Sequence, residues 1–98
     1  MKRAASVAEK LHMRRVVEMG CICCSHCYGY EGTPAHAHHV RLNHGWGRSG
    51  HKMTIALCPE HHVGKTGVHS LGRAEFEAMH GYSEIDLLAI THQKLGIE

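Results

Sequence analysis

The stretch Thr54-Ile-Ala-Leu-Cys-Pro-Glu-His-His62 contains the end of an apolar run, a Cys-x-x-His pair and a proline within one short segment. Residues 52–57 have the pattern of a short β-strand. Pro59 is suited to the first turn of a helix, where the N–H that proline lacks is not needed. We therefore expect Cys58 and His61 to lie where a strand passes into a helix.

A second cysteine-rich stretch lies upstream and is separated from the first by a predicted hairpin. Four of the five cysteines fall within residues 21–27. Residues 35–41 form another predicted strand, and residues 43–50, with glycines around Trp46, form a loop. Folding this hairpin brings the upstream cysteines towards Cys58 and His61.

Cys21 and Cys24 have the spacing of a ligand pair, and so do Cys58 and His61. Thiolate and imidazole ligands suit Zn²⁺. Four of them close a tetrahedral site that adds folding energy and leaves no position for a substrate. The two pairs on either side of a hairpin therefore predict a structural zinc.

The upstream half of this site can be paired in two ways. Cys24-x-x-Cys27 has the same spacing as Cys21-x-x-Cys24, and we prefer the latter pair. Cys23 and Cys27 are then spare thiols, for which simple packing is the first interpretation and a redox role the alternative.

Size and composition favour a metal-stabilised domain. The chain has 98 residues with 5 Cys and 12 His, but a single Trp and a single Phe. A chain this short buries a limited core and often needs another source of stability. No apolar run is long enough to span a bilayer and no secretory h-region is evident, so we expect a cytoplasmic protein with no membrane partner. In that compartment Cys-x-x-Cys spacing indicates metal ligation rather than disulfides.

Positive charge flanks the histidine-rich centre of the chain. The formal net charge is only +2, which alone is weak support for a polyanionic partner. The basic residues nevertheless gather in the first segment and around the central loop: Lys2, Arg3, Lys10, Arg14, Arg15, Arg41, Arg48 and Lys52. We expect a polyanionic partner, although a solvated helix face explains the first group equally well.

Three longer helices complete a predicted α+β fold. The first spans residues 4–19, with Val7, Ala8 and Leu11 on one face and Gly20 as its end. We divide the chain at this glycine into a basic helical arm, residues 1–20, and a second domain, residues 21–98, that contains the cysteines and most of the histidines.

The other two helices are predicted to cover the core. One spans Arg73 to His80, and one spans Ser83 to Leu95. In the last helix Ser83 and Asp86 resemble a capping box. Its apolar stripe is formed by Ile85, Leu88 and Leu95.

Two adjacent histidines, His38 and His39, lie in the first predicted strand. Neighbouring side chains in a strand point to opposite faces, so the two are not suited to the same task. One can bind a metal while the other takes a proton from water, and an imidazole pKa of about 6.5 suits both roles. His62 and His69 follow along the chain, and either can converge on the face that holds His38.

Such a set is typical of metal-assisted phosphodiester hydrolysis. A metal neutralises charge on the phosphate and the leaving oxygen, while a positioned base activates water. The histidines interpreted as packing or surface residues are His12, His26, His80 and His92. Those left open between the two interpretations are His36, His44 and His51.

The order of these motifs resembles that of the HNH (ββα-metal) endonucleases. The matching elements are a C-x-x-C pair, His38-His-Val40 closing one strand, and Leu57-Cys-Pro-Glu-His-His62 ending the next. Gly67-Val-His-Ser-Leu-Gly-Arg73 and Phe76-Glu77 narrow the resemblance to the phage recombination-enhancement (Ref) family of RecA-dependent HNH nucleases. The resemblance covers roughly residues 19–95.

The resemblance implies a small ββα-metal (HNH or His-Me finger) core with a zinc knuckle and flanking helices. It implies a structural Zn²⁺ and DNA cleavage with Mg²⁺ or Mn²⁺, in phage recombination or DNA processing within a bacterial host. Matched residue by residue, it assigns these roles: His38, His62 and His69 as ligands of the catalytic metal, His39 as the general base, and Cys58 and His61 as zinc ligands.

Two features depart from the family pattern. The asparagine that usually fixes the general base would fall near Met53, and methionine cannot take that role. His51 or a backbone carbonyl is the substitute we consider. The founding family member has a long basic N-terminal extension linked to RecA filaments, whereas only residues 1–20 precede Cys21 here. A RecA filament is therefore a weaker partner prediction than DNA.

Two alternatives stay open. A non-catalytic zinc-stapled nucleic-acid-binding module explains the four zinc ligands, but not why further histidines gather around His38. A redox or metal-sensing protein would rest on Cys23 and Cys27 alone. We favour the nuclease, a phosphodiester hydrolase.

Overall fold

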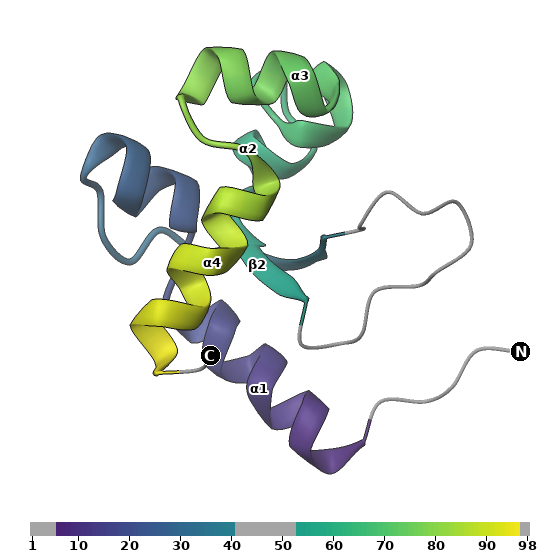
Figure 1. The fold of residues 1–98 in the computed structure, drawn as a ribbon, viewed down its shortest axis with the longest axis vertical. Coiled ribbons are helices and arrows are strands. Elements are labelled where there is room, and N and C mark those ends of the chain that lie inside the picture. Colours follow the sequence, from purple (N-terminus) through teal and green to yellow (C-terminus); the bar gives the residue numbers. More distant parts are fainter. Residues whose placement is uncertain (1–5, 41–52, 97–98) are drawn as a thin grey trace, which may run out of the picture.

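An antiparallel hairpin lies at the centre of the fold. The computed structural model describes residues 6–40 and 53–96, which form an α+β fold (Figure 1). The hairpin strands form a two-stranded sheet. The elements in chain order are α1 (Val7–Glu18), a π-helix η1 (Cys23–Cys27), β1 (His36–His39), β2 (Thr54–Leu57), α2 (Pro59–His62), α3 (Val68–His80) and α4 (Glu84–Leu95).

The register of the hairpin sets the positions of the candidate ligands. His38 pairs with Ile55, and His39 pairs with Thr54. All four side chains of β2 are buried, whereas β1 buries His38 and exposes His39. Both predicted strands are confirmed in shorter form, and the predicted loop at residues 43–50 lies outside the described residues.

Helix α1 confirms the predicted N-terminal helix but not its predicted face. Ser6 and Glu9 form a capping box at its start, and Gly20 follows its end with a φ of 84°. The predicted apolar face is wrong, since Val7 is 84% exposed and Leu11 is 55% exposed. The buried residues of α1 are instead His12 and Val16.

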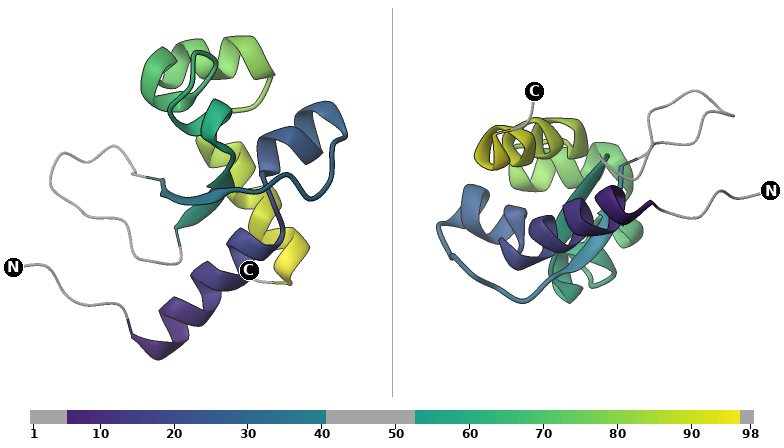
Figure 2. Two further views of the ribbon diagram at one scale, coloured as in Figure 1. Left: turned by 180° about the vertical axis from the view of Figure 1, so that it is seen from behind. Right: turned by 90° about the horizontal axis from the view of Figure 1, so that it is seen from below.

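Helices α1 and α4 both pack against the hairpin (Figures 1 and 2). Arg15 of α1 also donates a hydrogen bond to the carbonyl of Leu95 at the end of α4. Residues 6–20 are thus packed against the remainder of the described fold. The division into an arm and a nuclease domain at Gly20 stays a prediction.

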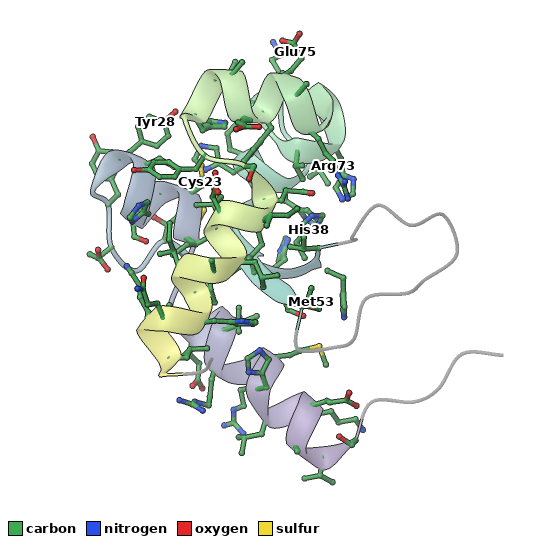
Figure 3. All side chains as sticks on the ribbon, in the orientation of Figure 1. Cys23, Tyr28, His38, Met53, Arg73 and Glu75 are labelled. Carbon is green, nitrogen blue, oxygen red and sulfur yellow. The ribbon has the colours of Figure 1, made fainter. Side chains whose placement is uncertain are left out.

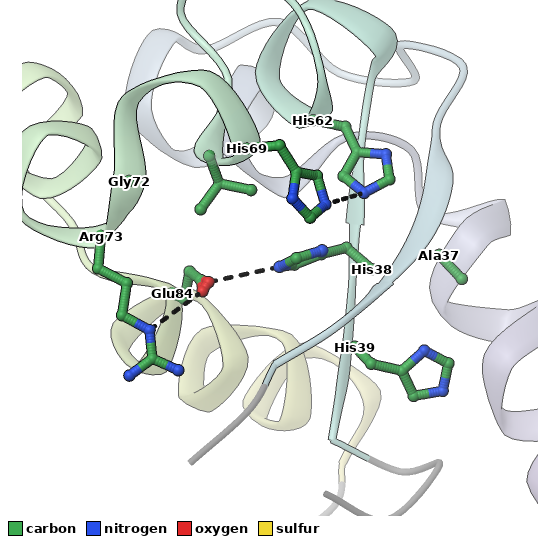
Figure 4. A pocket seen from close by; sticks show the side chains of 9 residues that line it. Ala37, His38, His39, His62, His69, Gly72, Arg73 and Glu84 are labelled. Atoms are coloured by element: carbon green, nitrogen blue, oxygen red, sulfur yellow. Dashed lines mark hydrogen bonds and ion pairs between the residues drawn. The ribbon is translucent and has the colours of Figure 1, made fainter. Parts of the chain in front are cut away.

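Helix α3 consists of two helical pieces joined at a kink. Gly72 has a φ of 80° and a ψ of 170°, a conformation that side-chain-bearing residues rarely adopt. The predicted helix from Arg73 to His80 is the second piece, and Val68 to Leu71 form an additional turn before it. The kink brings this turn to the side of the hairpin that holds His38 (Figure 4).

Helix α4 begins as the sequence predicts, with a reciprocal capping box between Ser83 and Asp86. Its predicted stripe is partly wrong, because Ile85 is 52% exposed and Leu87 is fully buried. Leu87 belongs to a single core cluster with Phe76 of α3 and Ile55 of β2. No helix in the described part of the chain is both long and apolar enough to cross a membrane.

Candidate metal sites and an adjoining pocket

Three cysteines and one histidine meet where η1 approaches the end of β2. Cys21, Cys24, Cys58 and His61 offer one ligand atom each, and all four atoms lie within 4.8 Å of one another. Nδ1 of His61 lies 3.6 Å from Sγ of Cys21, 3.5 Å from Sγ of Cys24 and 3.4 Å from Sγ of Cys58. The two thiols of Cys24 and Cys58 are 3.8 Å apart.

These separations match the edges of a zinc tetrahedron. Bond lengths of about 2.3 Å for Zn–S and about 2.05 Å for Zn–N give edges of about 3.8 Å between sulfurs and about 3.6 Å between sulfur and nitrogen. The four residues therefore form a group that could bind a metal such as zinc with little rearrangement.

The backbone of residues 21–27, called the knuckle below, supports the pairing of Cys21 with Cys24. The backbone N–H of Cys24 donates to Sγ of Cys21 over 3.3 Å, which favours a thiolate at that position. Cys27 is not a member of the four-residue group. The structure thus brings together Cys21 and Cys24 as the upstream pair.

Burial keeps the thiols of the knuckle protonated unless a cation is present. Burial raises the pKa of Cys21 to about 12, and burial also raises the pKa of Cys23 well above its ordinary value. A reactive thiol needs a lowered pKa. The spare Cys23 therefore has the character of a packing residue, although its thiol also contacts that of Cys27.

The rings of Tyr28 and His80 lie next to His61, and both side chains form hydrogen bonds of their own. Tyr28 stacks on His61 with an interplanar angle of 17°, and its hydroxyl lies 2.6 Å from Nδ1 of His80. Nε2 of His80 lies 2.9 Å from the carbonyl oxygen of Thr66, so Nε2 donates and Nδ1 accepts. His80 is thus a buried structural residue, as the sequence predicts. Cys23, His61 and His80 also offer one ligand atom each within 4.8 Å of one another.

Three histidines form a second group on the other side of α2. His38 of β1, His62 of α2 and His69 of α3 offer nitrogens that all lie within 4.8 Å of one another (Figure 4). Nε2 of His62 and Nε2 of His69 are only 3.1 Å apart. Nitrogens bound side by side to one divalent cation are separated by about 3.0–3.4 Å, depending on coordination number. This group could also bind a metal.

The electrostatic surroundings of His62 favour its neutral form. Burial lowers its pKa below 6.5, and the neighbouring charges of His38, His69 and His36 lower it further. A neutral imidazole has the lone pair that a metal requires. His62 is therefore ready to bind a cation at neutral pH.

Unlike the knuckle group, the three-histidine group opens onto a pocket. The pocket has a volume of about 450 Å³. Its lining consists of Ala37, His38, His39, His62, Val68, His69, Gly72, Arg73 and Glu84. A ligand that reaches the histidines through this pocket would also meet Arg73 and His39.

His39 lies at the margin of the same pocket, on the opposite side of β1 from His38 (Figure 4). His39 is exposed, and His38 is only 9% exposed. This difference agrees with the expectation that the two adjacent rings have separate tasks. The group that orients His39 stays a prediction, because His51 lies outside the described residues and Met53 packs against the core.

The sequence did not indicate a role for the two charged residues of the pocket, Arg73 and Glu84. Glu84 is 7% exposed, and its Oε2 lies 3.3 Å from Nε2 of His38. Its Oε1 lies 3.8 Å from Nε of Arg73. Glu84 is the first residue of α4, where an acidic residue is common because it offsets the helix dipole. Its position along the chain therefore carried no signal of a role beside a histidine.

Comparisons with known proteins add no assignment. No model of a known protein family matches this chain, and no curated protein matches it in sequence. The chemistry of the two groups therefore has to be derived from their own geometry.

Proposed function

We propose that this protein is a zinc-stabilised DNA endonuclease that hydrolyses phosphodiester bonds with a divalent metal. The observation that carries the proposal is the contrast between its two groups. Cys21, Cys24, Cys58 and His61 form a four-ligand group of zinc-like dimensions, which is typical of a structural site. His38, His62 and His69 supply three ligands beside a pocket, which is typical of a catalytic site with positions left for water and substrate.

The succession β1, β2, α2 supports assigning this core to the ββα-metal class. The first strand contributes His38, and the short helix after the second strand contributes His62. This placement agrees with the roles that the HNH resemblance implies for both residues. Membership of the Ref family, action in phage recombination and location in a bacterial host are parts of the proposal that rest on that resemblance alone.

The residues present fit a divalent cation, because three imidazoles converge and one of them is held neutral. A bound Mg²⁺ or Mn²⁺ would polarise the scissile phosphate and stabilise the leaving oxygen. Imidazole ligands suit Zn²⁺ and other transition metals, whereas Mg²⁺ prefers oxygen ligands, so Mg²⁺ would depend on water and phosphate oxygens at the positions that the three histidines leave free.

His39 is the proposed general base. Its exposed ring at the margin of the pocket can take a proton from a water molecule as that water attacks phosphorus. The bond from phosphorus to the leaving oxygen then breaks, and solvent protonates that oxygen. Arg73, which lines the same pocket, carries the charge that would attract a phosphate.

The proposal is tested by incubating supercoiled plasmid with the purified protein and Mg²⁺ or Mn²⁺, beside two variants. His39→Ala should lower the nicking rate by about 10²–10⁴-fold, which is the usual contribution of general-base catalysis. The variant should keep both metals. His26→Ala removes an exposed histidine from η1 and should cut normally.

Three outcomes are distinguishable. Equal nicking by His39→Ala and wild type would refute the general-base assignment. Plasmid binding without nicking under each metal, with or without RecA filaments, would replace the nuclease by the non-catalytic nucleic-acid-binding module. Neither binding nor nicking would remove DNA as the partner.

A further inference from the structure

A buried carboxylate lies directly behind the three-histidine group. Glu84 is 7% exposed and has two partners, His38 and Arg73. Burying an ionised carboxylate is costly unless charged or hydrogen-bonding groups satisfy it. Arg73 and the positive end of the α4 helix dipole both lie beside this carboxylate and offset its charge.

The contact with Glu84 selects one tautomer of His38. An ionised carboxylate can only accept hydrogen bonds, so Nε2 of His38, at 3.3 Å from Oε2, has to carry the proton. Nδ1 then keeps its lone pair. Figure 4 shows this second nitrogen on the ring edge that faces His62 and His69.

The position of Glu84 is fixed by its helix. Ser83 caps α4 immediately before it, and Leu87 and Leu88 of the same helix are buried in the core. The carboxylate therefore has little freedom to follow His38 if the ring turns. A partner held in this way restricts both the tautomer and the rotation of a ligand ring.

Glu84 is placed behind the ligands rather than among them. The group of side chains whose ligand atoms come within 4.8 Å of one another contains His38, His62 and His69, without Glu84. Its contact is to the nitrogen of His38 that faces away from the other two histidines.

We propose that Glu84 is the positioning residue of the three-histidine site: it holds His38 as the Nε2–H tautomer and so directs Nδ1 at the cation. Arg73, whose Nε lies 3.8 Å from Oε1 of Glu84, holds the other oxygen of the carboxylate. This inference rests on the proposed metal site and deepens it. It assigns Glu84 no contact with metal or substrate.

The first measurement is the tautomer of His38 itself, read by long-range ¹H–¹⁵N correlation spectra of histidine-labelled, zinc-containing protein without a second cation. Wild type should show the Nε2–H form alone. Glu84→Gln, which keeps the shape but can present either an oxygen or an NH₂ group, should show a mixture. The matched control is Glu75→Gln. This substitution removes the same charge from the outer side of α3, away from His38 (Figure 3).

The second measurement is the affinity of the three-histidine site for Co²⁺, titrated into the same zinc-containing proteins. Glu84→Gln should weaken binding by about 10–100-fold, the usual effect of removing a partner behind a metal-bound histidine. Zinc content and melting temperature should show that the fold is retained, and Glu75→Gln should bind as wild type does.

Either measurement can overturn the inference. A wild-type His38 in the Nδ1–H form, or a Glu84→Gln variant that binds Co²⁺ as tightly as wild type, refutes the positioning role. The expected tautomer and affinity loss in a protein that never nicks DNA would instead leave the positioning role standing and refute the nuclease.

Discussion

Cys58 joins β2 to α2 and belongs to the four-residue group at the knuckle, so Cys58→Ala tests the structural metal directly. The side chain is 5% exposed, and its Sγ lies 3.4 Å from Nδ1 of His61 and 3.8 Å from Sγ of Cys24. Alanine removes one of the four ligands, and neither Cys23 nor Cys27 belongs to the group. We expect loss of the bound zinc and of the folded state together.

The magnitude follows from the size of the chain. A domain of 98 residues is stable by about 5–15 kcal/mol in total. A structural zinc contributes an apparent 10–16 kcal/mol in zinc-finger peptides at neutral pH, about the whole of that margin. Loss of the metal should therefore abolish the cooperative transition rather than lower its midpoint by a few degrees.

The assay combines zinc analysis of the purified protein with thermal unfolding followed by circular dichroism. Cys27→Ala is the matched control, because it removes a half-buried thiol from the same knuckle outside the four-residue group. It should keep the zinc and lose about 1 kcal/mol, equivalent to about 4–8 °C in melting temperature.

Two results would refute the reasoning. A Cys58→Ala protein that retains one tightly bound zinc and the wild-type melting temperature would show that the thiol is not a ligand. A Cys27→Ala protein that loses its zinc would instead require the pairing of Cys24 with Cys27.

Three further predictions concern the kink, the core and the second site. Gly72→Ala should cost about 1–3 kcal/mol, measured by thermal unfolding, because φ at this position is 80° and ψ is 170°; an unchanged melting temperature would contradict this. Phe76→Ala should cost about 3–5 kcal/mol in urea unfolding, because the ring is fully buried in the core cluster, and a loss below about 1 kcal/mol would mean that the core is assembled differently. Protons compete with the cation at His62 only as the pH falls through its lowered pKa, so the loss of Mn²⁺ affinity that belongs to His62, measured by calorimetry as the difference between wild type and His62→Ala, should begin below pH 6.5. An affinity that already declines well above pH 6.5 would assign that titration to another group.

The group of Cys21, Cys24, Cys58 and His61 could be predicted from the sequence because each of its two ligand pairs depends on local spacing. Cys21 and Cys24 approach one another within one turn of chain, and Cys58 and His61 do so at the start of α2. A hairpin is then enough to bring the two pairs together. The same reasoning succeeded at the start of α4, where Ser83 and its capping partner are local.

The contribution of Glu84 could not be predicted, since it depends on how α4 crosses the hairpin. Its partner His38 is 46 residues away along the chain. No spacing rule connects a helix-starting glutamate with a strand histidine at that separation. Only the packing of Leu87 and Leu88 places the two side chains together.

The incorrect face of α1 has a different cause. The prediction counted Val7 and Leu11 as the buried side because they are apolar, yet the helix buries His12 and Val16. A histidine is neutral for part of the accessible pH range and can enter a core, so apolar periodicity misses it. The face of α1 that holds Val16 is buried because it packs against the hairpin.

The single turn α2 carries His61 into one metal group and His62 into the other. Adjacent residues on a helix point about 100° apart, so this segment of four residues fixes the angle between the directions of the two side chains. One inserted or deleted residue in this turn would rotate the residues that follow by about 100° about the helix axis, so the turn should be intolerant of length variation. If the Cys21, Cys24, Cys58 and His61 group binds zinc, loss of that zinc would free α2, and His62 would leave the three-histidine group although all three histidines are still present.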